Sequence, residues 1–175
     1  RILFDGTTMR AAAAGGGVRG DIEEHACEPR AAGPGSTRVL QRRFAVPAAD
    51  RRDLGIHSEL IPDAAVDLIE AGVITGARKN FKPRKIIVGF ALGTRRFFEF
   101  VDNNPIFEFH PTAYTNDPAL IARNDNMVAI NSALQVDMTG QVCSDSIGNQ
   151  FYSGIGGQVD FLRGASRSKR GKAII

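Results

Sequence analysis

The sequence predicts an α/β fold in which an open, largely parallel β-sheet is flanked by helices. The first observation is that short β-rich runs alternate with short helical runs from Leu54 onward. The second is the continuous apolar run Lys85–Phe90, which is typical of a buried strand in a parallel sheet. Because such alternation favours parallel pairing with right-handed crossovers, we expect the helices to connect neighbouring strands.

The first expected strand and helix place one carboxylate where ligands bind in such folds. From Leu54 the chain is expected to form a strand that ends on Glu59, followed by a helix over Pro62–Ala71 with Gly72 as its stop. A side chain at this turn lies at the carboxyl edge of the sheet, where open α/β folds keep their ligands. Position alone leaves two readings of Glu59, a catalytic acid or a solvated charge at a helix start.

The remaining elements follow the same alternation. Thr94 is expected to cap a helix over Arg95–Val101, and Asp117 a helix over Pro118–Ala122 with the proline in its first turn. Besides the apolar run already described, the expected strands are Ile106–His110, Met127–Ile130 and Ala133–Met138.

The residues before Asp50 differ from the rest. Alanine, glycine, proline and arginine dominate there, and neither a helical nor a strand period persists. We expect residues 1–50 to be irregular and residues 51–175 to form the folded unit. Two explanations stay open for roughly residues 7–47: a segment translated from the wrong reading frame, or a natural flexible linker.

Composition narrows the possible functions. The 175 residues are 43% hydrophobic and 23% charged, as in a globular protein with one buried core. No apolar run reaches the roughly 18 to 20 residues that span a bilayer, and no signal peptide is recognisable, so we expect a cytoplasmic protein without a membrane partner. The net charge of +3 comes from scattered basic residues, and we therefore expect no nucleic-acid partner.

Two smaller groups of residues are candidates for ligand binding. Cys27 and Cys143 are the two cysteines and lack neighbours at metal-ligand spacing, so we expect free thiols and no metal site. Arg167, Lys169, Arg170 and Lys172 form a basic cluster that could bind a phosphate group or keep a chain end soluble. Charge alone leaves both roles open.

The stretch Gly154–Phe161 has three glycines in four positions, which lets backbone N–H groups approach an anion or a developing oxyanion. It is not a dinucleotide-binding fingerprint, because the third glycine is missing at the required offset. The alternative is a tight turn between a strand and a helix.

Seven motifs in a fixed order carry a family resemblance. They are His57-Ser-Glu59, Gly72-Val-Ile-Thr-Gly76, Phe100-Val-Asp-Asn-Asn-Pro105, Asn116-Asp-Pro118, Asn131-Ser-Ala-Leu-Gln-Val-Asp137, Gly140-Gln-Val142 and Gly154-Ile-Gly-Gly-Gln-Val-Asp-Phe-Leu-Arg-Gly164. Residues 51–175 thereby resemble the acetyl-CoA hydrolase/transferase family of class I CoA-transferases, most closely those of the 4-hydroxybutyrate or butyrate type. The resemblance implies a Rossmann-like fold in the broad sense and an incomplete domain.

The resemblance implies roles for individual residues. Glu59 matches the nucleophile, which forms a glutamyl-CoA thioester in a ping-pong cycle. Asn116 and Gly157 match the donors that stabilise the oxyanions, although spacing alone favours a turn residue at Asn116. The residues implied to bind CoA or the acyl group are Gly154, Gly156, Gly157 and Gln158. His57 is assigned no role, because a carboxylate needs no base at neutral pH.

The implied partners are an acyl-CoA and a small carboxylic acid. No cofactor is implied, since CoA is a substrate. The resemblance also allows the full-length enzyme to be a homo-oligomer. The chain departs from the family in two ways. Asp5-Gly6 is not followed by the family's Gly-x-Gly-x-Ile-Pro loop, and the chain stops at Ile175 where the family continues. We therefore expect an internal fragment, with transferase activity, hydrolase activity or no activity of its own as the alternatives.

Overall fold

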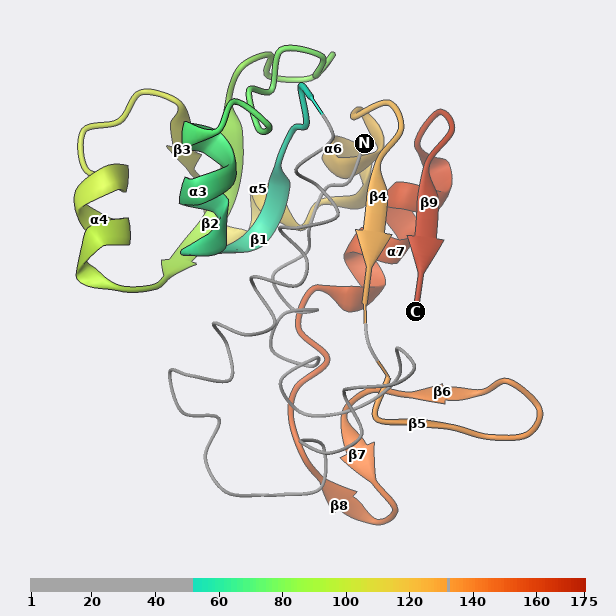
Figure 1. The fold of residues 1–175 in the computed structure, drawn as a ribbon. Coiled ribbons are helices and arrows are strands. Elements are labelled where there is room, and N and C mark those ends of the chain that lie inside the picture. Colours follow the sequence, from blue (N-terminus) through green and yellow to red (C-terminus); the bar gives the residue numbers. More distant parts are fainter. Residues whose placement is uncertain (1–51, 132) are drawn as a thin grey trace.

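The computed structural model describes residues 52–131 and 133–175, and these residues have the predicted α/β architecture (Figure 1). A parallel sheet has the strand order β1-β2-β3, with bounds His57–Pro62, Ile86–Leu92 and Phe107–Phe109. A second parallel pair joins β4 to β9, with bounds Val128–Ile130 and Lys172–Ile174. The prediction of a largely parallel sheet with flanking helices is therefore confirmed.

Five helices connect or cover these strands in the described residues: α3 Ala64–Glu70, α4 Arg95–Val101, α5 Thr112–Thr115, α6 Pro118–Ala122 and α7 Gln158–Arg167. The predicted bounds of α4 and α6 are confirmed. Asp117 caps α6 as predicted, because its carboxylate accepts a hydrogen bond from the Ala119 amide at 2.8 Å.

One hydrophobic core joins the three-stranded sheet to the second part of the chain. Its fully buried members include Val88 of β2, Ile121 of α6, Phe161 of α7 and Met127, which directly precedes β4. The apolar run of β2 behaves as predicted only in its first half: Ile86, Ile87 and Val88 are buried, whereas exposure alternates in the second half.

The first strand extends further than the sequence predicted. β1 does not end on Glu59 but continues to Pro62, because it stays paired with β2 as far as Leu92. Pro62 is consequently the last strand residue rather than the first helical one, and α3 begins at Ala64 after Asp63 at its N-cap position. Glu59 therefore lies inside a strand, three residues before its end.

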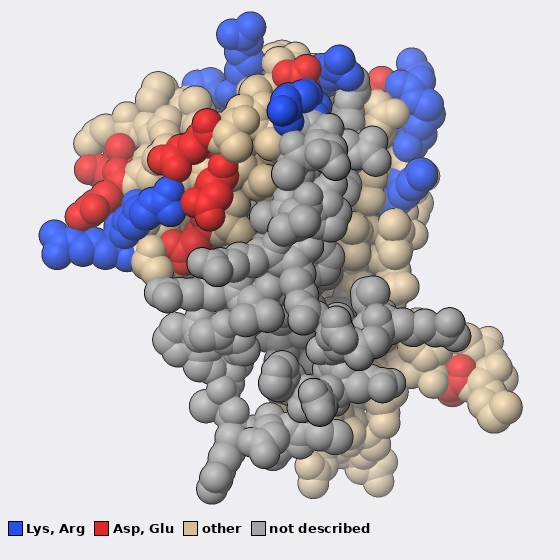
Figure 2. All heavy atoms as spheres, viewed as in Figure 1, with Lys and Arg blue, Asp and Glu red and all other residues tan. Residues whose placement is uncertain are grey.

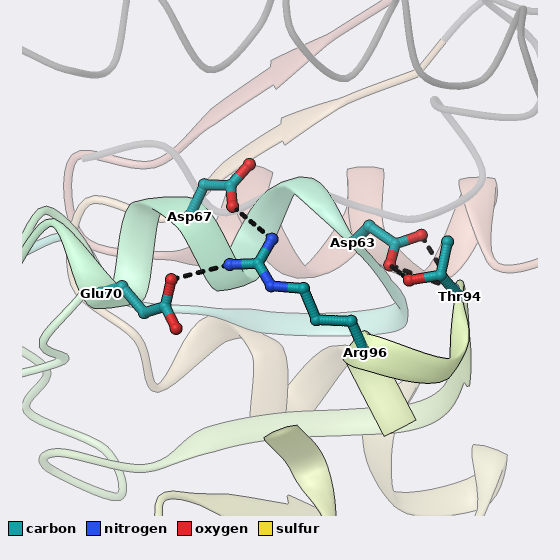
Figure 3. Close-up of polar contacts among 5 residues, drawn as sticks. All are labelled: Asp63, Asp67, Glu70, Thr94 and Arg96. Carbon is teal, nitrogen blue, oxygen red and sulfur yellow. Dashed lines mark hydrogen bonds and ion pairs between the residues drawn. The ribbon is translucent and has the colours of Figure 1, made fainter. Parts of the chain in front are cut away.

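Polar contacts join α3 to α4 (Figure 3). Arg96 donates to Asp67 at 2.9 Å and to Glu70 at 2.8 Å, and Asp63 accepts from the Thr94 hydroxyl at 2.6 Å. Thr94 holds the predicted N-cap position but makes no capping hydrogen bond, and its hydroxyl donates to the Asp63 carboxylate. Gly93 allows this approach, since a Cβ there would lie 2.9 Å from Asp63 Oδ2.

The prediction of a strand over Ala133–Met138 is wrong in extent. Only Gln135–Val136 is a strand, β5, and it pairs antiparallel with β6 at Val142–Cys143. Asp137 ends the strand, because its carboxylate accepts from the Thr139 amide at 2.8 Å and from the Gln141 amide at 2.9 Å. A second hairpin follows, formed by β7 Ser146–Ile147 and β8 Gln150–Phe151.

Charges of both signs lie side by side over the helical part of the surface (Figure 2). In the C-terminal basic cluster, Lys169 lies 3.9 Å from Asp125, and Arg170 donates to Asn126 at 2.9 Å. Within the described residues no helix is long and apolar enough to cross a membrane. The predictions for residues 1–50 and for Cys27 lie outside the described residues.

Candidate active site

Glu59 and Asn116, which lie 57 positions apart in the chain, meet in a direct hydrogen bond. Asn116 Nδ2 donates to Glu59 Oε2 at 2.6 Å. Glu59 is partly buried between the buried Ser58 and Leu60 of β1, so its carboxylate is presented from a rigid strand. A charged acceptor at this distance makes a strong hydrogen bond, which holds Oε2 in one place.

Asn116 is the C-cap residue of the short helix α5, directly before the N-cap Asp117 of α6. The turn reading of this residue is therefore correct for its backbone. Its side chain, however, is buried and faces Glu59 instead of capping a helix. The side chain thus lies beside the carboxylate, and its role as an oxyanion donor stays a prediction.

Gly157 completes a three-residue cluster with Glu59 and Asn116. It is the N-cap residue of α7 and is buried. A Cβ placed on it would overlap both Glu59 Oε2 and Asn116 Nδ2. Its φ of −81° is open to any residue, so the requirement for glycine is one of space rather than of backbone conformation. The structure therefore brings together the three residues predicted to be catalytic.

The rest of the glycine loop is arranged differently. Gly154 and Gly156 are exposed, and a Cβ on Gly154 would meet nothing within 4 Å. Gly156 has a φ of 54°, which glycine adopts without strain, and the turn it makes leads into α7. Gln158 is buried in the first turn of that helix. The loop is thus a turn into a helix, as the alternative reading of this stretch had it, and its last glycine also lies beside the carboxylate.

The amino end of α7 adds a favourable electrostatic contribution to the cluster. Helix dipoles are positive at this end, and the ten-residue α7 begins directly after Gly157. A negative charge on Glu59 or on an oxyanion beside Gly157 is stabilised by this field. The predicted N–H donor therefore belongs to the N-cap residue of this helix.

His57 is fully buried two residues before Glu59. Its Nε2 donates to the Thr115 carbonyl at 2.8 Å, and its Nδ1 accepts from Asn124 Nδ2 at 3.3 Å. Burial lowers the pKa of His57 to about 4, so the imidazole is neutral at pH 7. No hydrogen bond joins it to Glu59.

Lys79 joins β1 and β2 at their amino ends. Its Nζ donates to the carbonyls of Ile56 and Lys85, each at 2.8 Å, directly before β1 and β2. Burial lowers the pKa of Lys79 to about 7. The sequence did not single out Lys79, because several basic residues surround it and no local pattern distinguishes a buried lysine from an exposed one.

Thr115 and Asn124 were also missed. Thr115 is fully buried at the end of α5, and its hydroxyl donates to Asn116 Oδ1 at 3.0 Å. The one sequence signal that could have indicated Thr115 was its position directly before Asn116. Nothing in the sequence showed that its partners would come from β1. Among the described residues, no group of three or more His, Cys, Asp or Glu side chains could hold a metal ion.

Comparison with known proteins identifies relatives of this arrangement. Residues 93–175 match the model of the family described as acetyl-CoA hydrolase/transferase C-terminal domain. The 4-hydroxybutyrate coenzyme A transferase of Clostridium kluyveri is 54% identical over 126 residues, which are 72% of this chain and 29% of that protein. An acetyl-CoA hydrolase of Yarrowia lipolytica is 29% identical over 122 residues, 69% of this chain and 22% of that protein.

A solved structure agrees with these matches. The crystal structure of 4-hydroxybutyrate CoA-transferase from Porphyromonas gingivalis superposes with a TM-score of 0.65 at 38% identity, covering 75% of this chain and 30% of that one. The chain therefore spans less than a third of the length of the curated relatives it matches.

Proposed function

Because this chain belongs to the acetyl-CoA hydrolase/transferase family, we propose that the whole protein transfers CoA between an acyl-CoA and a small carboxylic acid. The observation that carries the proposal is the contact of Glu59 with Asn116 and Gly157. A carboxylate, an amide donor and a helix N-terminus in one place are what covalent transfer through a carboxylate requires.

The first half of the reaction converts Glu59 into a thioester. A carboxylate oxygen of Glu59 attacks the thioester carbon of the acyl-CoA, and the CoA thiolate leaves, which gives a mixed anhydride. The thiolate then attacks the side-chain carbonyl carbon of Glu59. The first acid leaves as a carboxylate with the bridging oxygen, and a glutamyl-CoA thioester remains. No proton is transferred in either step.

The second half reverses the first with another acid. The incoming carboxylate attacks the glutamyl thioester, the thiolate leaves, and a second mixed anhydride forms. The thiolate attacks the acyl carbon of that anhydride, so the new acyl-CoA departs and Glu59 is restored as a carboxylate. The sequence is a ping-pong cycle that needs no cofactor besides CoA itself.

The positions of Asn116 and Gly157 support their assignment to the oxyanions. When the thiolate attacks the glutamyl carbon, negative charge develops on the side-chain oxygen that remains, and Oε2 already accepts from Asn116 Nδ2. The N–H of Gly157, at the amino end of α7, is the second proposed donor. We assign Gly154, Gly156, Gly157 and Gln158 to binding of CoA or the acyl group.

Acids of the 4-hydroxybutyrate, butyrate or acetate type are the proposed substrates, since 4-hydroxybutyrate appears in the name of the Clostridium kluyveri relative. We propose a cytoplasmic enzyme that can assemble as a homo-oligomer. The second candidate function is acetyl-CoA hydrolysis, in which water takes the place of the second acid. The Yarrowia lipolytica relative favours it, although that relative is less similar to this chain.

The test uses a graft enzyme, defined as the Clostridium kluyveri relative with residues 52–175 of this chain in place of its matching segment. Butyryl-CoA and isotopically labelled acetate are supplied, and label in acetyl-CoA demonstrates transfer. Release of free CoA without an acceptor acid demonstrates hydrolysis. A folded graft enzyme that does neither, while the parent relative is active, would contradict the proposal.

A further inference from the structure

The hydroxyl of Thr115 has one partner among the described residues, and that partner is the amide facing Glu59. Thr115 Oγ1 donates to Asn116 Oδ1 at 3.0 Å, while Asn116 Nδ2 donates to Glu59 Oε2 at 2.6 Å. The two hydrogen bonds use opposite ends of one planar amide. They form a continuous chain from a buried hydroxyl to the proposed nucleophile.

Such a chain has two physical effects on Asn116. The hydroxyl fixes the side-chain rotation, because Oδ1 is held on one side and Nδ2 must then lie on the other. Donation to Oδ1 also polarises the amide, so its N–H groups become stronger donors in a buried environment. Both effects act on Asn116 Nδ2, which is the proposed donor to an oxyanion at Glu59.

Thr115 is itself held rigidly. Its backbone carbonyl accepts from His57 Nε2 at 2.8 Å, and the other ring nitrogen of His57 accepts from Asn124. On the side of β2, a Cβ at Gly89 would lie 3.3 Å from Thr115 Oγ1, so glycine there leaves room for the hydroxyl. His57 therefore holds the backbone of Thr115, Asn124 holds His57, and no hydrogen bond joins Thr115 directly to Glu59.

We propose that Thr115 is a positioning residue for the reaction of Glu59, and that its hydroxyl orients and polarises the amide of Asn116. This inference rests on the proposed function. The effect of Thr115 on the reaction passes through Asn116, to which its hydroxyl donates. His57 contributes by holding the backbone of Thr115.

Kinetics of the graft enzyme test this through a double-mutant cycle. Thr115→Val keeps the branched shape and removes the hydroxyl, so kcat should fall about tenfold, the effect of one hydrogen bond, with KM for acyl-CoA unchanged. Thr115→Ser keeps the hydroxyl and should restore most of kcat. Asn116→Ala alone should lower kcat about a hundredfold or more.

The decisive comparison is the double variant. If Thr115 acts only through Asn116, Thr115→Val should cost nothing further once Asn116 is alanine. A tenfold loss that persists in the Asn116→Ala background would overturn the proposal, because a general packing defect adds to the other loss. Loss of kcat in Thr115→Ser equal to that in Thr115→Val would overturn it as well.

A readout independent of activity separates this inference from the proposed function. In the 175-residue chain, the side-chain amide NMR signals of Asn116 can be assigned by their loss in Asn116→Asp. Thr115→Val should shift them upfield and Thr115→Ser should leave them in place. Unchanged signals in Thr115→Val would reject the inference even if the graft enzyme transfers CoA, and an inactive unmutated graft enzyme would reject the proposed function alone.

Discussion

The cluster around Glu59 and the two hairpins over residues 135–151 are built on opposite principles. The cluster combines β1, the end of α5 and the start of α7, and its side chains are bonded across more than fifty positions of sequence. Within the described residues each hairpin strand pairs with the strand next to it in sequence, and the hairpins expose large apolar side chains such as Val136 and Phe151. The cluster therefore depends on contacts between distant segments, whereas the pairing of the hairpin strands depends on local turns.

The largest expected effect is loss of the nucleophile. Glu59→Gln in the graft enzyme keeps the size of the side chain but cannot form the anhydride, so kcat should fall by about a thousandfold or more. Borohydride reduction after incubation with butyryl-CoA, followed by peptide mass spectrometry, should find the modified residue at Glu59. Glu99→Gln, an exposed carboxylate on α4 paired with Arg95, is the matched control and should keep full activity. Labelling on another residue would refute the assignment.

Two phenylalanines compare the stability of the regions directly. Phe161 is fully buried in the core, and Phe161→Ala should lower the free energy of unfolding by about 3 to 5 kcal/mol. Phe151 in the second hairpin is 75% exposed, and Phe151→Ala should change it by less than about 0.5 kcal/mol. Urea unfolding of the chain followed by circular dichroism measures both. Equal losses would show that the hairpin is as tightly packed as the core.

Acid should weaken the cluster before it weakens the first hairpin. The pKa of His57 is lowered by burial to about 4 from 6.5, so the unfolded chain binds a proton in this interval and the folded chain does not. Stability should therefore fall by up to about 3 kcal/mol as the pH drops from 6.5 to 4.

The other shifted groups act in different pH windows. The lowered pKa of Lys79, about 7, affects stability at higher pH, where stability falls as the pH drops toward 7. The pKa of Asp137 is lowered by hydrogen bonds from Thr139 and Gln141, so its contribution to stability is present above pH 3.8 and is lost as the pH falls through its folded pKa.

Urea unfolding tests the prediction for His57. In His57→Gln the free energy of unfolding should depend less on pH between pH 6.5 and 4 than in the unmutated chain. If His57→Gln left this pH dependence unchanged, His57 would not be its cause.

Two glycines of one loop give the smallest but most specific comparison. Gly157→Ala forces a methyl group against Glu59 Oε2 and Asn116 Nδ2 and should lower kcat of the graft enzyme about a hundredfold. Gly154→Ala adds the same methyl group in open space, so kcat should change less than about threefold, and any loss should appear in KM for acyl-CoA, which Gly154 is proposed to bind. If both variants lost activity equally, the cause would be the flexibility of the loop rather than the crowding at Gly157.

Local signals in the sequence were sufficient for much of the fold. Thr94 and Asp117 each stand directly before a helix, and the bounds of α4 and α6 were predicted correctly from them. The strand over Ala133–Met138 was predicted too long because the side chain of Asp137 turns the chain there. β1 was predicted too short because its end is set by its pairing with β2, which no local pattern reveals.

The candidate site could be predicted only in part. Family resemblance pointed to Glu59, Asn116 and Gly157, and the structure brings these three together. The hydrogen bonds of Thr115 and His57 could not be predicted, because they depend on how α5 packs against β1. Short polar residues of this kind carry no periodic signal, and tertiary contacts alone decide their partners.

The fixed contact of Oε2 has a stereochemical consequence for a transferase that works through Glu59. Asn116 donates to Oε2 and Gly157 lies beside it, so the other oxygen of the carboxylate attacks and becomes the bridging atom of the first anhydride. That atom leaves with the first acid and is replaced by one from the second. Over many cycles with heavy-oxygen acids, one oxygen of Glu59 would be exchanged in every turnover, and the other would remain the atom incorporated when the chain was synthesised.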